Sequence, residues 1–170
     1  MGFFEYSVRQ FASSVGGTVT KTAEDNLTVD FSFADFNKMV LWLTQNPQQS
    51  VLTLKTTENN TRKLELNINI NNYSELQQII PFLADKDIEV YGPTYNQDYT
   101  QEDYIEMMEF IAGDGAREGI LSSHIDIQLN LPSSVINTNG TQVSSTCVAF
   151  SFPLIDFLTL KEPIQLFAEF

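Results

Sequence analysis

Two stretches of strict apolar–polar alternation constrain the fold of this chain more than any other feature. Leucine or isoleucine occupies every second position from Leu64 to Ile70 and again from Ile125 to Leu131, with polar residues between them. Successive side chains of a β-strand point to opposite faces, so this pattern predicts strands with one buried face and one wet face. Sheets of that kind are usually antiparallel, because parallel sheets are covered on both faces. The sequence therefore predicts a mainly antiparallel sheet.

Other segments complete the expected architecture. Apolar residues at helical spacing predict helices over residues 3–15, 34–45, 72–83 and 101–112, with a short helical crossing over 154–160. Further strands are expected over residues 18–22, 27–33, 51–57, 143–152 and 164–170. Residues 88–96, with Gly92 and Pro93 in the middle, are expected to form a short strand that leads into a fixed loop. We expect an α+β fold in one domain spanning residues 1–170, with a mainly antiparallel sheet of about six to seven strands packed against three to four helices.

Two helix starts show the residue pattern of a capping box. Asn72 precedes Glu75 by three residues, and Thr100 precedes Asp103 by the same spacing. In a capping box, the first side chain bonds a backbone N–H of the first turn and the second side chain bonds back to the cap residue. We expect a helix to begin after each of these cap residues, and Gly113 to end the second helix.

Charge and cysteine content exclude several classes of function. The chain carries 22 acidic and 9 basic residues, a formal net charge of -13, so its field repels phosphate backbones and nucleic-acid binding is not expected. Cys147 is the only cysteine, which rules out an intramolecular disulfide and any zinc site built on several thiolates. A single cysteine fits a reducing cytoplasm and a bacterial envelope equally well.

Catalytic and metal sites are not expected from the residue pattern. His124 is the only histidine, and Ser122, Ser123 and Asp126 lie too near it along one strand to converge as a triad. Cys147 lies in an apolar strand, where a packing role is expected. The acidic stretch from Asp98 to Glu109 lacks the spacing of a calcium loop and is expected to be a solvated helix face. We therefore expect no enzyme activity and no cofactor.

Four tyrosines form the candidate binding surface. Tyr91, Tyr95, Tyr99 and Tyr104 cluster around Gly92 and Pro93. Tyrosine combines an apolar ring with a polar tip, so it is common both at binding surfaces and at the edges of cores. Both a ligand or partner surface and a structural role are therefore open for these side chains.

The second half of the chain, residues 73–170, resembles a family of uncharacterised bacterial cell-envelope lipoproteins, chiefly of the spirochaetal kind. The motifs that carry the resemblance are Glu89-Val-Tyr-Gly-Pro93 with Tyr95-Asn96, Glu102-Asp-Tyr104, Ser122-Ser123, Asn139-Gly140, Phe152-Pro-Leu-Ile-Asp-Phe-Leu158 and Glu162-Pro163-Ile164. The resemblance implies a location on the periplasmic or surface side of the envelope. It also implies a signal peptide and a lipid-bearing cysteine ahead of these 170 residues, so that membrane attachment would depend on that anchor alone.

Two functions follow as hypotheses. The first is a non-enzymatic envelope lipoprotein domain that binds a protein partner or forms part of a surface assembly. The alternative is a carrier of lipid or another small apolar molecule, held in a cavity lined by Phe and Leu between the sheet and the helices.

Overall fold

The computed structural model describes residues 18–21, 27–30 and 50–170. Strands β1 (Thr18–Lys21) and β2 (Leu27–Asp30) pair antiparallel in a sheet of their own, with Val19 opposite Val29. This pairing confirms the first expected hairpin over its described residues. The helices expected over residues 3–15 and 34–45 lie outside the described residues.

The strands from β3 to β9 form two antiparallel sheets. The first sheet has the order β3-β4-β9-β6 and contains β3 (Leu52–Thr56), β4 (Arg62–Ile68), β6 (Asn137–Thr138) and β9 (Ile164–Glu169). The second sheet has the order β5-β8-β7 and contains β5 (His124–Asn130), β7 (Thr141–Ser144) and β8 (Cys147–Pro153). The predicted α+β class and antiparallel pairing are therefore confirmed.

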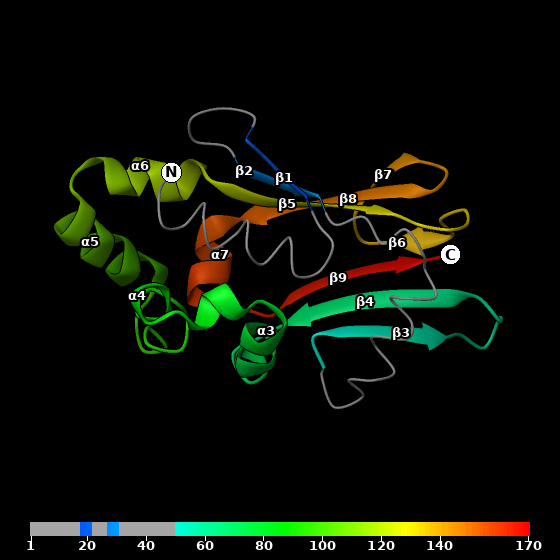
Figure 1. Cartoon of the computed structure of the whole chain (residues 1–170), viewed down its shortest axis with the longest axis horizontal. Helices are drawn as coiled ribbons and strands as arrows, with labels where there is room; N and C mark the ends of the chain where they lie inside the picture. Colours follow the sequence, from blue (N-terminus) through cyan, green and yellow to red (C-terminus); the bar gives the residue numbers. More distant parts are fainter. Residues whose placement is uncertain (1–17, 22–26, 31–49) are drawn as a thin grey trace.

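The described helices gather at one end of the molecule, and the two larger sheets extend from them toward the other end (Figure 1). They are α3 (Tyr73–Ile79), the 3-10 helix η1 (Pro81–Ala84), α4 (Lys86–Glu89), α5 (Gln101–Ala112), α6 (Gly115–Ser122) and α7 (Leu154–Thr159). Helix α7 follows β8 directly and contacts α5 and α6, whereas α3 lies beside the end of β4 (Figure 1). None of the described helices has the length and apolar content needed to cross a membrane.

The two larger sheets pack against each other through their apolar faces. Val148 of β8 and Ala168 of β9 are completely buried and belong to one cluster with Phe150. Half-buried apolar residues of both sheets and their loops pack against this cluster, namely Ile127, Leu129, Leu131, Val135 and Leu166. The alternating pattern places these side chains inward because the strand period is two. This part of the core thus lies between the sheets, as in sandwich packing. A second cluster, which includes Ile68, Tyr73, Leu76 and Ile164, joins the first sheet to α3.

One of the two expected capping boxes is confirmed and the other is wrong. Thr100 accepts a hydrogen bond from the Asp103 backbone N–H, and the Asp103 carboxylate accepts one from the Thr100 N–H, as a capping box requires. Asn72 makes no such bond: its Oδ1 accepts from the Asn69 N–H, and its Nδ2 donates to the Asn67 carbonyl. Glu75 instead accepts from Ser50. Asn72 is buried and serves the preceding turn, so it is not available to the helix.

Two expected strands also differ from the structure. The short strand expected at the start of residues 88–96 is wrong, because Asp85 caps the short helix α4 there; the loop expected after it is present as a series of turns. The strand expected over residues 143–152 is two strands, β7 and β8, separated by a turn in which the Ser144 hydroxyl accepts from the Thr146 N–H. Serine favours turns through bonds of this kind.

Strand β6 was not predicted, because two residues are too few to show a pattern. It pairs with β9, and the side chain of Asn139 extends the contact beyond it. Asn139 Nδ2 donates to the Gln165 carbonyl at 2.7 Å, while its Oδ1 accepts from the Phe167 N–H at 2.8 Å. Gly140 follows at a point where the chain passes close to β8.

Gly140 has no space for a side chain. A Cβ at this position would lie 2.6 Å from Phe150 Cε1 and 2.7 Å from the Ala149 carbonyl oxygen. We expect Gly140→Ala to lower the free energy of unfolding by about 1–3 kcal/mol, as overpacked sites do. Gly119→Ala in α6 is the matched control, because its added Cβ would meet no atom of the described residues within 4 Å apart from its chain neighbours and its own helix backbone. In urea unfolding the control should be neutral or up to about 1 kcal/mol more stable; equal stability of Gly140→Ala and the unmutated protein would contradict this packing.

Candidate functional site

The segment between α4 and α5 is folded by a buried asparagine. Asn96 is only 4% exposed, and its Nδ2 donates to the carbonyl oxygens of Val90 at 3.2 Å and Gly92 at 2.8 Å. Backbone turns add bonds from the Gly92 N–H to the Glu89 carbonyl and from the Tyr99 N–H to the Asn96 carbonyl. The Asn96 side chain therefore joins the end of this segment to its beginning at Val90 and Gly92.

Two buried tyrosines contact this segment on the side that faces the core. Tyr104 of α5 is 1% exposed and donates its hydroxyl to the Tyr91 carbonyl oxygen at 2.8 Å. Tyr73 of α3 lies under Gly92, where an added Cβ would be 3.1 Å from the Tyr73 hydroxyl. From the side of α7, Lys161 Nζ donates to the Gln97 carbonyl. The segment is thus held by α3, α5 and the turn after α7.

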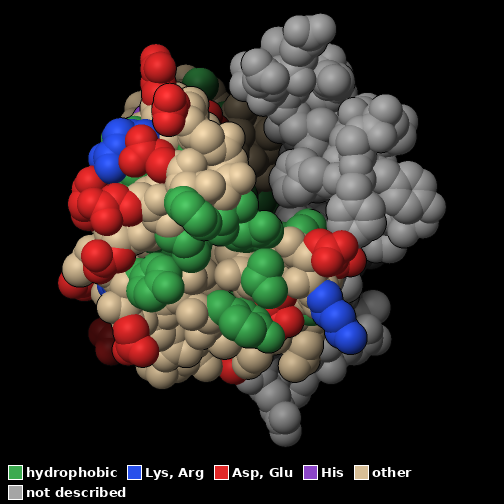
Figure 2. Space-filling model, turned by 90° about the vertical axis from the view of Figure 1, so that its left-hand side faces the viewer, with side chains coloured by type: hydrophobic (Ala, Val, Ile, Leu, Met, Phe, Trp, Pro, Cys, Tyr) green, Lys and Arg blue, Asp and Glu red, His purple; other side chains and the backbone are tan. Residues whose placement is uncertain are grey.

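The outer side of the segment exposes apolar side chains. Tyr95 is 62% exposed, Val90 44% and Tyr99 40%. We call residues 90–99 the tyrosine platform. Figure 2 shows the side of the molecule on which α4 and α5 lie, with hydrophobic side chains gathered across its middle and acidic side chains along one border.

The structure therefore divides the four predicted tyrosines. Tyr95 and Tyr99 are exposed on the platform and are able to contact a partner. Tyr91 is half-buried and supplies a backbone acceptor, whereas Tyr104 is in the core. The structural role left open by the sequence is present in Tyr104 and in the backbone of Tyr91. The role of the exposed pair in binding stays a prediction.

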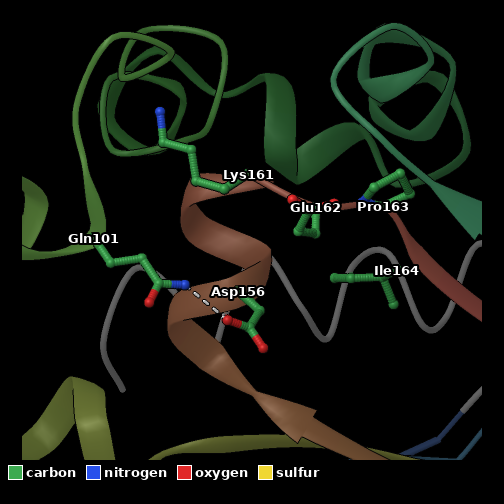
Figure 3. Close-up of a pocket in the computed structure, with 6 residues that line it drawn as sticks. All are labelled: Gln101, Asp156, Lys161, Glu162, Pro163 and Ile164. Atoms are coloured by element: carbon green, nitrogen blue, oxygen red, sulfur yellow. Dashed lines mark hydrogen bonds between the residues drawn. The ribbon is translucent and has the colours of Figure 1, made fainter.

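A small hollow adjoins the platform (Figure 3). We call it the α7 hollow; its volume is about 180 Å³, and it is lined by Gln101, Asp156, Lys161, Glu162, Pro163 and Ile164. Gln101 Nε2 donates to Asp156 Oδ1 at 2.8 Å across it, while Lys161 extends away from that pair (Figure 3). Sequence reasoning missed this hollow because its walls come from α5, α7 and the turn before β9.

A second hollow, of about 480 Å³, lies on the wet face of the first sheet. Glu65 stands between two lysines there, with Lys63 Nζ at 2.7 Å and Lys55 Nζ at 3.0 Å from its carboxylate oxygens. Hydrogen bonds from Lys63 and Lys55 lower the pKa of Glu65. Lys63 Nζ also lies 4.4 Å from the centre of the Phe167 ring. Both lysines therefore form ion pairs with the same carboxylate on a partly exposed surface.

The residues considered for catalysis are not brought together. His124 is exposed at the start of β5, and its Nδ1 lies 3.2 Å from the Ser122 carbonyl. Cys147 is buried and accepts from Gln128 Nε2 at 3.0 Å. In the β5–β8 register His124 pairs with Pro153 and Cys147 with Asn130, so the imidazole and the thiol lie at opposite ends of the strand pair.

The acidic face of α5 is partly paired with a cation. Arg117 of α6 contacts Glu102 at 2.7 Å and Glu109 at 3.0 Å, which ties α6 to α5. The hydrogen bond from Arg117 lowers the pKa of Glu102. Within residues 18–21, 27–30 and 50–170, no three His, Cys, Asp or Glu side chains are grouped so that they could hold a metal ion.

Comparisons with known proteins give one structural similarity. No protein-family model matches the chain, and no curated protein matches it. Among solved structures, the chain is similar to the folded domain of the Mycobacterium tuberculosis LppM protein, with a TM-score of 0.38 and 13% sequence identity. The match covers 92% of this chain and 64% of the LppM domain, so this chain spans less than two thirds of the length of that domain. A similarity of this size identifies neither a family nor an activity, and the resemblance to spirochaetal envelope lipoproteins stays a prediction.

The buried tyrosines make a prediction about alkaline stability. Burial raises the pKa of Tyr104 to about 12 and that of Tyr73 to about 12, above the usual value of about 10. Between pH 10 and pH 12 the unfolded chain therefore binds fewer protons than the folded chain, so stability falls as the pH rises through this window. Tyr104→Phe removes one of the two groups.

We expect Tyr104→Phe to be less stable at pH 8 by about 1 kcal/mol, because the Tyr91 carbonyl loses its donor. Between pH 9 and pH 11 the variant should then lose less stability than the unmutated protein. Guanidinium unfolding of both proteins at the three pH values measures this. An identical loss in the two proteins would contradict the burial of the Tyr104 hydroxyl.

Proposed function

We propose that this chain is a non-enzymatic binding domain whose tyrosine platform contacts a protein partner. The observation that carries the proposal is the exposure of Tyr95, Tyr99 and Val90 on a segment that Asn96 and Tyr104 hold in place. Tyrosine is enriched among the residues that dominate binding energy at interfaces. A segment ordered before binding loses little further conformational entropy when a partner docks.

Charged side chains in the walls of the two hollows described above favour a protein partner over an apolar small molecule. Both hollows have charged groups beside their apolar side chains. In the α7 hollow Asp156, Lys161 and Glu162 accompany Pro163 and Ile164. In the larger hollow Lys55, Lys63 and Glu65 accompany Leu66, Leu166 and Phe167. An acyl chain requires an apolar cavity, because unpaired polar groups lose hydration when lipid covers them. The partner-binding hypothesis is therefore preferred to the lipid-carrier alternative.

The envelope location is part of the proposal and is supported by the family resemblance of residues 73–170. In that setting the domain presents the platform to the periplasm or the cell surface. A lipid anchor ahead of residue 1 would hold it at the membrane, and no enzymatic step is required of it.

The test is selection of binding peptides from a displayed random library against the whole chain. Selected peptides should lose at least about tenfold in affinity for Tyr95→Ser/Tyr99→Ser, which corresponds to about 1.4 kcal/mol. The control is Ile136→Ser/Val143→Ser, which also removes two exposed apolar side chains, one just before β6 and one in β7. Peptides that bind the tyrosine variant as tightly as the unmutated protein would refute the proposal. So would a stoichiometric lipid released by solvent extraction of the purified chain.

A further inference from the structure

We infer that the partner segment that docks on the tyrosine platform is basic, and that one of its arginine or lysine side chains enters the α7 hollow. This inference rests on the proposed function of the platform. It is carried by the charges that flank the exposed tyrosines and by the acceptor groups of the hollow.

Carboxylates outnumber cations on the segments that flank the platform. The carboxylates of residues 85–109 that Arg117 does not contact are Asp85, Asp87, Glu89, Asp98, Asp103 and Glu106. The lysines are Lys86 in the same segment and Lys161 in the turn after α7. Hydrogen bonds from Thr100 lower the pKa of Asp103, so its carboxylate is charged at neutral pH. The whole chain carries a net charge of -13. Complementary charge around an interface speeds association and rejects like-charged partners, so a basic segment fits this surface.

The α7 hollow supplies the acceptors that a cationic side chain needs. With Gln101 Nε2 donating to Asp156 Oδ1, the remaining acceptors in the wall are the second Asp156 oxygen, the Gln101 amide oxygen and the Glu162 carboxylate. Among the described residues of the wall the cation is Lys161, which points away from Gln101 and Asp156 (Figure 3) and donates to the Gln97 carbonyl. Pro163 and Ile164 complete the wall with apolar surface, against which the methylene groups of an arginine or lysine can pack.

The hollow and the tyrosine platform are linked through the chain and through one hydrogen bond. Gln101 follows Tyr99 by two residues, and Lys161 joins the turn after α7 to the platform through Gln97. The exposed tyrosine rings of the platform offer a basic segment a second attraction, since the face of an aromatic ring attracts guanidinium and ammonium groups. A volume of about 180 Å³ fits one side chain better than a whole ligand.

An NMR titration tests the hollow without the rest of a partner. The probe is Nα-acetyl-arginine amide, and Nα-acetyl-norleucine amide is the uncharged control. Arginine amide should shift the signals of Gln101, including its side-chain amide, and of residues 156–164, with weaker binding at higher salt. Norleucine amide should leave these signals unchanged. Equal shifts with both probes, or no localised shifts with arginine amide, would overturn the inference.

Two variants make the test specific. Glu162→Gln should weaken arginine amide binding about threefold to fivefold, the range of an exposed ion pair. Glu58→Gln, which removes an exposed carboxylate between β3 and β4, should leave binding unchanged. Equal weakening in the two variants would show a general charge effect and would overturn the assignment of the hollow.

The library peptides separate this inference from the proposed function. Peptides that require Tyr95 and Tyr99, carry an arginine or lysine and weaken with Glu162→Gln support both. Peptides that require the tyrosines but carry no basic residue and ignore Glu162→Gln overturn the inference and leave the binding function standing. Peptides that ignore the tyrosines overturn the proposed function itself, whatever arginine amide does in the hollow.

Discussion

The carbonyl oxygens of the turn between α4 and α5 need hydrogen-bond donors, and Asn96 and Tyr104 supply them. Asn96 bonds the Val90 and Gly92 carbonyls, and the Tyr104 hydroxyl bonds the Tyr91 carbonyl. A carbonyl buried without a donor costs free energy comparable to a lost hydrogen bond, so these bonds fix the path of the backbone. Since the backbone of the turn points its polar groups inward, the side chains of Tyr95 and Tyr99 are left on the outside.

Both supports are tied to the rest of the fold. Tyr104 shares a core cluster with Ile105 of its own helix and with Ile155 of α7. Helix α7 follows β8, whose Val148 packs against Ala168 of β9 between the two sheets. The tyrosine platform is therefore connected through α5 and α7 to the most deeply buried part of the molecule. This arrangement places an exposed surface on rigid elements, as recognition sites require.

The sequence predicted the parts of the fold that repeat with a period. The alternation from Leu64 to Ile70 and from Ile125 to Leu131 predicted β4 and β5, and the Thr100–Asp103 pair predicted the start of α5. The predictions for Asn72 and for residues 88–96 were wrong for one reason. Asn72, Asp85 and Asn96 bond to backbone groups of nearby turns, and these local bonds compete with the cap and the strand that the residue pattern suggested. The platform was predicted as a group of tyrosines, but not which of them are exposed. Tyr104 lies one turn before Met108 on the apolar stripe of α5, a signal that would have assigned it to the core. The α7 hollow depends on residues 101 and 156–164, and only the tertiary fold brings them together.

Backbone order on the nanosecond timescale tests the central claim most directly, because the account depends on a platform that is ordered before any partner binds. Nitrogen-15 relaxation should give amide order parameters of about 0.85 for residues 91, 92 and 94–99, equal to those of α5. Asn96→Ala should lower these values while leaving α5 unchanged, and Gln97→Ala, which removes only an exposed bond to the Thr94 carbonyl, should not. Order parameters below about 0.6 across the platform of the unmutated protein would contradict the account.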